Sequence, residues 1–195
     1  LGVTGYFCEF NTLGNLWTSR ISSHIPLKDA ASYVTQDRII AASQLIYDSL
    51  KLAGNDAPRV AVAAFNPHAG EGGTCGREEI EVIVPAVEAC KVQGYLIDGP
   101  FPADTIFIKA RDGEYDAIVT MYHDQGQIAI KLMGFKQGVT VQGGLPIPIT
   151  TPAHGTAFDI AGTGQADVNP TRNAFTIACQ MGRNLRRQRL EANAG

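Results

Sequence analysis

Apolar residues recur at a helical period in several parts of this chain. The clearest case lies between Thr35, a typical N-cap residue, and Gly54, a typical helix stop. The apolar residues that repeat along one face of this segment are Ile39, Ala42, Ile46 and Leu50. Helices are also predicted at about 76–93 and 170–189, and a shorter helix is predicted after Gly126.

Short apolar runs between these helices predict strands. The runs at 59–65 and 117–122 are continuous, which is typical of strands that are buried on both faces. The segments 5–10 and 16–22 flank a turn-rich insert, 11–15, and therefore predict a hairpin. Shorter strands are predicted at 95–98 and 138–142. This alternation of strands and helices predicts an α/β fold with a mostly parallel sheet and helices on both faces.

The composition and net charge of the chain indicate which kinds of molecule it is expected to bind. The chain has 195 residues, 45% hydrophobic and 18% charged, with a net charge of −3. That charge gives no reason to expect nucleic acid or an anionic membrane, and no apolar run is long enough to cross a bilayer. Four cysteines are widely spaced without a Cys-x-x-Cys pair, which favours a reducing compartment, the cytoplasm, over a disulfide framework. We expect a small-molecule substrate.

Two histidines follow the two buried strands. His68 comes after the run at 59–65, and His123 comes after the run at 117–122. A lone histidine is more often a structural residue than a ligand. If these strands are neighbours in a parallel sheet, however, both imidazoles emerge at the same edge, where open α/β sheets bind ligands. The pattern therefore predicts a shared metal site, and imidazole favours zinc or another divalent transition metal.

Charged side chains accompany these histidines. Asp104 and Asp124 are predicted to complete or orient the metal site or to assist proton transfer, although Asp104 could instead cap the helix that follows it. Lys131 offers a fixed positive charge for a phosphate or carboxylate of the substrate, although taken alone it reads as a surface lysine. Together these groups favour a metal-dependent dehydrogenase, because a divalent ion eases hydride departure from an alcohol.

The glycine-rich loop at 154–164 is a candidate cofactor site. It matches neither the Gly-x-Gly-x-x-Gly dinucleotide motif nor the phosphate-binding P-loop. Its glycines allow a ligand to approach the backbone closely, and Asp159 is able to accept a hydrogen bond from a ribose hydroxyl.

Several segments, in the right order, resemble the 4-hydroxythreonine-4-phosphate dehydrogenase family. They are 24–29 (His-Ile-Pro-Leu-Lys-Asp), 66–73 (Asn-Pro-His-Ala-Gly-Glu-Gly-Gly), 99–105, 121–126 (Met-Tyr-His-Asp-Gln-Gly) and 154–162. The last segment also resembles the adenosine-binding loop of the isocitrate and isopropylmalate dehydrogenase superfamily. The resemblance implies that superfamily's fold. It also implies NAD or NADP binding by His154, Gly155, Thr156, Ala157, Asp159 and Gly162.

The resemblance further implies a reaction and an assembly. The reaction is oxidation of a secondary alcohol followed by decarboxylation, in pyridoxal phosphate biosynthesis, by a homodimer whose active sites are shared between subunits. The family holds a divalent metal with three histidines, and two of them match His68 and His123. The third belongs to a segment expected before Leu1. Residues 1–195 are therefore expected to form the C-terminal portion of a two-domain enzyme.

The substrate-binding positions differ from the family pattern. Lys131 matches the lysine that contacts the substrate phosphate, but Thr140 and Ile149 stand where the family usually has asparagine and arginine. Loss of the arginine removes a bidentate contact with phosphate. Two alternative substrates therefore remain, a carboxylated cyclohexadiene cis-diol and a four-carbon sugar-acid phosphate. A third alternative is a catalytically silent fragment that only binds or dimerises.

Overall fold

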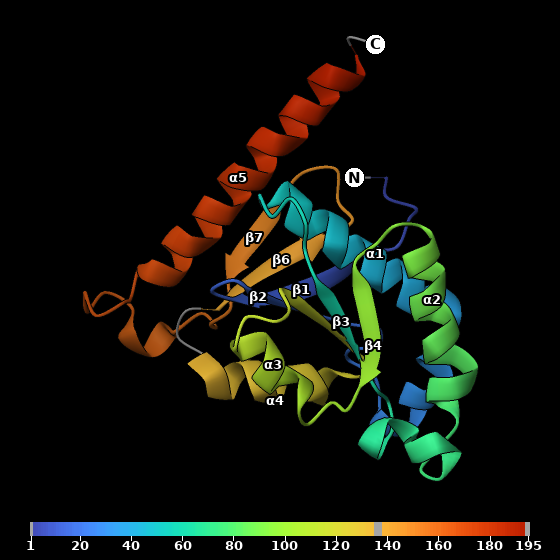
Figure 1. Cartoon of the computed structure of the whole chain (residues 1–195). Helices are drawn as coiled ribbons and strands as arrows, with labels where there is room; N and C mark the ends of the chain where they lie inside the picture. Colours follow the sequence, from blue (N-terminus) through green and yellow to red (C-terminus); the bar gives the residue numbers. More distant parts are fainter. Residues whose placement is uncertain (1, 135–137, 194–195) are drawn as a thin grey trace.

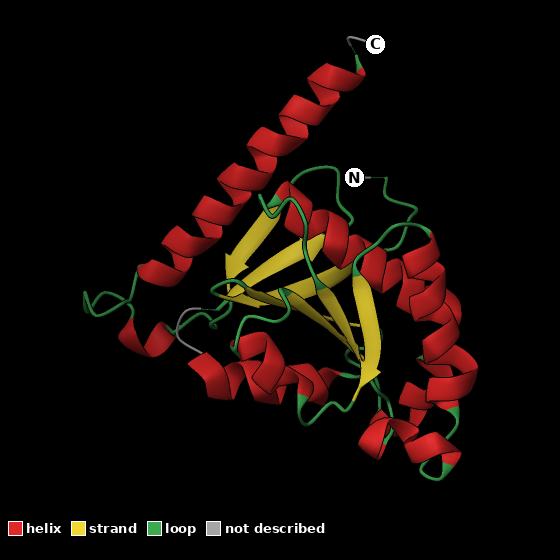
Figure 2. Cartoon of the chain, viewed as in Figure 1, coloured by secondary structure: helices red, strands yellow, loops and turns green. Residues whose placement is uncertain are grey.

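The computed structural model describes residues 2–134 and 138–193 and contains one seven-stranded sheet between helices (Figure 2). The strands are β1 (Cys8–Leu13), β2 (Leu16–Arg20), β3 (Val60–Ala63), β4 (Ile97–Phe101), β5 (Ala117–Thr120), β6 (Val139–Gly143) and β7 (Ile149–Pro152). Their order across the sheet is β4-β3-β5-β2-β1-β6-β7.

The sheet has a parallel half and an antiparallel half. β4, β3, β5 and β2 run parallel to one another, whereas β2, β1, β6 and β7 are paired antiparallel. The α/β class is confirmed, but parallel pairing covers less of the sheet than the sequence predicted. The reason is the predicted hairpin, in which a tight turn at Gly14 and Asn15 reverses the chain and makes β1 antiparallel to β2.

Helices cover both faces of the sheet, as predicted (Figure 1). They are α1 (Gln36–Leu52), α2 (Val84–Val92), α3 (Ile106–Arg111), α4 (His123–Gly134) and α5 (Asn169–Ala192), with short turns η1 (Leu27–Tyr33), η2 (Pro67–Gly73), η3 (Glu79–Ile83) and η5 (Phe158–Ile160). The helical period of α1 is confirmed, because its four repeating apolar residues are all buried. The Thr35 hydroxyl caps this helix by accepting a hydrogen bond from the backbone N–H of Arg38.

The strands of the parallel half are buried on both faces. In β3, Val60 and Val62 pack in the core beneath α1 and α2, whereas Ala61 and Ala63 pack in a second core with α3 and α4. All four residues are fully buried, because adjacent side chains of a strand point to opposite faces. The continuous apolar pattern therefore predicted this strand correctly.

Two element boundaries differ from the prediction and bear on the site. β4 continues through the predicted loop at 99–101, because β4 is an edge strand, where proline is tolerated. α4 begins at His123, before Gly126, so His123 and Asp124 lie in the first turn of a helix and not in a loop. Within the described residues, no helix is both long and apolar enough to span a membrane.

Candidate functional site

The predicted site residues lie beyond the carboxyl ends of neighbouring parallel strands. His68 follows β3, Asp104 follows β4, and His123 with Asp124 follows β5. β3 pairs with both β4 and β5, so the two histidine-bearing strands are neighbours, which is the condition that the sequence analysis set for a shared site. These four side chains are called the strand-end residues below.

His123 is oriented by its neighbour. Its Nδ1 lies 2.7 Å from Oδ1 of Asp124, and this contact leaves Nε2 as the ring nitrogen available to a ligand. The ring also lies beside His24, with 5.6 Å between the ring centroids. His24 reaches this place because it follows β2, which is the other neighbour of β5. Sequence reasoning did not assign His24 to the site.

His68 lies in a turn of left-handed backbone. Residues 68–73 all have positive φ, and His68 itself has φ 53° and ψ 30°. This conformation costs a non-glycine residue about 1–2 kcal/mol, so the turn requires support from its surroundings. The buried carboxylate of Glu79 gives that support, because its Oε1 accepts hydrogen bonds from the backbone N–H groups of Phe65 (2.8 Å) and Asn66 (2.7 Å).

A second carboxylate reinforces this support. The Asn66 side-chain amide donates to Oε2 of Glu78 at 2.6 Å and to Oε2 of Glu79 at 3.0 Å. A hydrogen bond from its own backbone N–H, together with the bond from Asn66, lowers the pKa of Glu78. The side chain therefore stays ionised at neutral pH, and the His68 turn is anchored from η3.

The strand-end residues line three depressions of the surface. His68, Asp104 and Asp124 line a groove of about 590 Å³. His123 lines a cavity of about 320 Å³, and together with Asp124 and His24 it also lines a smaller depression of about 200 Å³. Across residues 2–134 and 138–193, no three His, Cys, Asp or Glu side chains are grouped so that they could hold a metal ion.

Asp104 does not cap a helix. The N-cap position of α3 is Thr105, and no side chain caps the helix there. The capping alternative for Asp104 was therefore wrong.

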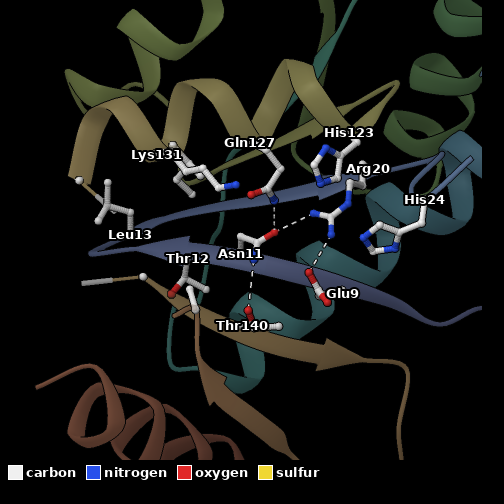
Figure 3. Close-up of a pocket in the computed structure, with 14 residues that line it drawn as sticks. Glu9, Asn11, Thr12, Leu13, Arg20, His24, His123, Gln127, Lys131 and Thr140 are labelled. Atoms are coloured by element: carbon white, nitrogen blue, oxygen red, sulfur yellow. Dashed lines mark hydrogen bonds and ion pairs between the residues drawn. The ribbon is translucent and has the colours of Figure 1, made fainter. Parts of the chain in front are cut away.

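The cavity beside His123 also contains Lys131 and Thr140, both of which the sequence analysis selected (Figure 3). Lys131 extends from α4, and Thr140 lies on β6, across the cavity from it. Ile149, on β7, does not line this cavity. Apolar side chains of Leu13 and Ile130 complete part of its wall.

A network of polar side chains forms the floor of this cavity, and sequence reasoning missed it. Arg20 is only 6% exposed, and its guanidinium donates to Oε1 of Glu9 (2.7 Å) and to Oδ1 of Asn11 (2.7 Å). Asn11 Oδ1 also accepts a hydrogen bond from the Gln127 amide, and Asn11 Nδ2 donates to the Thr140 hydroxyl at 3.2 Å. We call these five residues the buried polar network.

The sequence contained a signal for this network. Arg20 falls inside a predicted strand, and Glu9 and Asn11 are two residues apart, so they share one face of a strand. A charged residue in a buried strand needs a partner, and an acid on a facing strand is the simplest one. The signal was overlooked because Asn11 was placed in the turn.

The predicted cofactor loop is exposed along its length. Residues 154–159 and 161–164 are all exposed, and Ile160 is half-buried. Ala157 has φ 49°, and the turn η5 follows it. A methyl group added to Gly155 or Gly162 would meet no other atom within 4 Å, so the backbone is open on these sides.

Comparison with known proteins gives a single family. The model of the family described as pyridoxal phosphate biosynthetic protein PdxA matches residues 1–178. A relative from Pseudomonas aeruginosa, named "Putative 4-hydroxythreonine-4-phosphate dehydrogenase 2", is 60% identical over 94% of this chain and 55% of its own length. A D-threonate 4-phosphate dehydrogenase from Pectobacterium atrosepticum is 44% identical over 83% of this chain and 49% of its own length.

Solved structures agree with this family. The crystal structure of 4-hydroxythreonine-4-phosphate dehydrogenase from Klebsiella pneumoniae has a TM-score of 0.79 and 39% identity, covering 92% of this chain and 55% of that protein. A terephthalate 1,2-cis-dihydrodiol dehydrogenase from Burkholderia xenovorans has a TM-score of 0.74 and 30% identity, covering 89% and 55%. The chain thus spans about half the length of the relatives that it matches.

Proposed function

This chain belongs to the family of the pyridoxal phosphate biosynthetic protein PdxA, and we propose that it forms part of a dehydrogenase. The proposed reaction is NAD- or NADP-dependent oxidation of a secondary alcohol, assisted by a divalent metal and followed by decarboxylation. One observation carries the proposal. His123, held by Asp124, lines the same cavity as Lys131, so a candidate metal ligand and a cation for an acidic substrate face one space.

The donor chemistry fits a metal, but one chain does not complete the site. An imidazole held by a carboxylate is the usual arrangement of a metal-binding histidine. A catalytic zinc needs three protein ligands, and the described part of this chain does not group three. We assign His68 and His123 to this metal site, with the third histidine in the segment expected before Leu1, in a homodimer with shared active sites. Bound there, a divalent ion would supply Lewis-acid polarisation of the substrate hydroxyl.

The remaining residues have separate tasks in this proposal. Lys131 binds the negatively charged group of the substrate, and Thr140 lies across the cavity from it. Asp104 and Asp124 orient the ligands or receive the hydroxyl proton, and a bound nicotinamide would supply the hydride acceptor. The open backbone of His154, Gly155, Thr156, Ala157, Asp159 and Gly162 is the proposed contact for the adenosine part of the cofactor.

The default substrate is 4-hydroxythreonine 4-phosphate, which is in the names of two of the four relatives above. D-threonate 4-phosphate and the cis-dihydrodiol of terephthalate are the alternatives, and each is in the name of a relative reported above. Ile149 lies outside the cavity and cannot bind phosphate, which favours the non-phosphorylated diol as the second candidate. Zinc is the proposed metal, and the cytoplasm is the proposed location. Residues 1–195 would form the C-terminal portion of a two-domain enzyme.

The test uses the full-length enzyme with His68→Ala or His123→Ala. We expect each variant to lose bound metal and at least about 100-fold in turnover, because even residues that only support a metal ligand contribute 10- to 100-fold. Lys51→Ala, on the exposed end of α1, is the control and should keep both properties. Metal content by mass spectrometry, together with turnover of the three alcohols, gives the result.

Three outcomes would separate the alternatives. Unchanged metal content and turnover in both histidine variants would disprove the metal assignment. Activity with only one of the three alcohols would identify the substrate. A full-length protein that binds neither NAD nor zinc in calorimetry, and oxidises none of the alcohols, would favour the silent binding or dimerisation module.

A further inference from the structure

The guanidinium of Arg20 is a buried cation in the wall of the candidate substrate cavity. It is held on three sides, by Glu9 at 2.7 Å, by Asn11 at 2.7 Å, and by the Ser23 hydroxyl, which accepts from Nε at 3.0 Å. Figure 3 shows it between Glu9 and Asn11, on the side of the cavity where His24 and His123 lie. Its position is therefore fixed before any ligand arrives.

Arg20 keeps donor groups for a ligand. A guanidinium has five N–H groups. The described residues accept hydrogen bonds from Nε once, from Nη1 once and from Nη2 once. One N–H on each Nη atom thus has no partner among the described residues, although the side chain is only 5% exposed and lines the cavity. Two N–H groups held in one plane match the two oxygens of a carboxylate.

The charges around the cavity favour an anionic ligand. Arg20 and Lys131 are cations that line it, and Glu9 is its only acidic side chain among the described residues. Leu13 and Ile130 in the same wall favour an apolar carbon skeleton next to the charge.

We propose that Arg20 is a specificity-determining residue that binds a carboxylate group of the substrate, attached to an apolar skeleton. This inference rests on the proposed function, because it assigns the substrate class of the same cavity. The competing explanation is structural, since Arg20 and Glu9 form an ion pair that would by itself hold β1 against β2. A structural role predicts a loss of stability without a change in ligand preference.

The test measures binding of benzoate, benzamide and inorganic phosphate to the full-length protein by calorimetry. Benzoate carries the carboxylate, benzamide has the same shape without the charge, and phosphate is the competing anion. In the wild type, we expect benzoate to bind at least about 10-fold more tightly than benzamide or phosphate, as is usual for a charged hydrogen-bond pair.

Arg20→Lys keeps the charge but loses the planar fork, and we expect it to weaken benzoate binding by about 10- to 100-fold. Arg38→Lys is the matched control. Arg38 is half-buried and its guanidinium donates to the backbone carbonyl of Ile21, but it does not line this cavity. The control should bind benzoate within about 3-fold of the wild type, and thermal unfolding checks that each variant is folded.

Three results would overturn the proposal. They are no benzoate binding by the wild type, tighter binding of phosphate than of benzoate, and equal binding of benzoate by a folded Arg20→Lys variant. Because binding is measured without turnover, a wild type that binds benzoate but oxidises none of the three alcohols would refute the proposed function and leave the role of Arg20 standing. If an alcohol is oxidised, Arg20→Lys should raise its KM by a similar factor and change kcat little.

Discussion

The strand-end residues and the buried polar network present polar chemistry in opposite ways. The strand-end residues follow the parallel strands in turns and a helix start, and Asp124 is 69% exposed. The network extends from inside β1, β2 and β6, with Gln127 added from α4, and its Arg20 is almost fully buried. In the parallel half, the candidate site side chains lie beyond the ends of the strands, so their placement has little effect on the stability of the core. In the antiparallel half, the same side chains that shape the cavity also hold the sheet together.

The largest expected effect comes from removing the centre of the network. Asn11→Leu deprives Arg20, Gln127 and Thr140 of a hydrogen-bond partner inside the protein. We expect a loss of about 2–5 kcal/mol in the free energy of unfolding, since a buried charged group without its partner is costly. Urea denaturation measures this loss. Asn173→Leu, at an exposed position of α5, is the control and should change stability little.

A small effect of Asn11→Leu on the free energy of unfolding would contradict the contrast between the two regions. If the variant lost no more stability than the Asn173 control, the network would be a set of contacts that water replaces easily. Its role would then be limited to binding, like that proposed for the strand-end residues.

A second prediction concerns the left-handed turn that carries His68. A methyl group at Gly70 (φ +77°) would lie 2.6 Å from Glu79 Oε2, whereas at Gly72 (φ +63°) it would meet no atom within 4 Å. Both substitutions with alanine disfavour the left-handed backbone, by about 1 kcal/mol. Only Gly70→Ala also displaces the carboxylate that anchors the turn, so we expect it to lose about 1–3 kcal/mol.

Denaturation of the two glycine variants gives a direct comparison. Equal losses would show that Glu79 moves aside freely and that the His68 turn is held by something else. A larger loss for Gly70→Ala, accompanied by weaker metal binding, would show that one strand-end residue does depend on a buried group.

The parallel half was predictable because its signals are local. A run of β-branched and small apolar residues, as at 59–65, is typical of a strand that is buried on both faces of a sheet. The structure places β3 beside β5 inside the sheet. The loops after these strands held the histidines and carboxylates that attracted attention. A shared metal site is not predictable in the same way, because it depends on side-chain directions, which such local patterns do not encode.

The antiparallel half was harder because its determinants are distant in sequence. Asn11, in a segment rich in turn residues, was assigned to a turn, yet it pairs with Thr18 in β2 and bonds to Arg20 and Gln127. Tertiary partners thus override the local preference of asparagine for turns. α4 was predicted to begin after Gly126 for a related reason, since nothing local shows that His123 already lies in the first helical turn.

The smallest change in stability, and the sharpest contrast with Asn11, is expected for Asp124→Asn. The amide oxygen of asparagine can still accept the hydrogen bond from His123, but the negative charge beside the imidazole is gone. Because the side chain is largely exposed, we expect the free energy of unfolding to change by less than about 0.5 kcal/mol. Under the proposed metal assignment, turnover of the full-length enzyme should nevertheless fall by about 10- to 100-fold, because a carboxylate that orients a metal ligand contributes about that factor.

Asp56→Asn, an exposed carboxylate away from the strand-end residues, should change neither quantity. Unfolding curves and turnover measured on the same preparations decide between the two regions. If Asp124→Asn left turnover intact, the contact with His123 would be a surface contact without function. If it destabilised the protein as much as Asn11→Leu, the strand-end residues would also contribute to the core. Either result would contradict the proposed contrast, in which the strand-end residues serve catalysis and the buried polar network stabilises the fold.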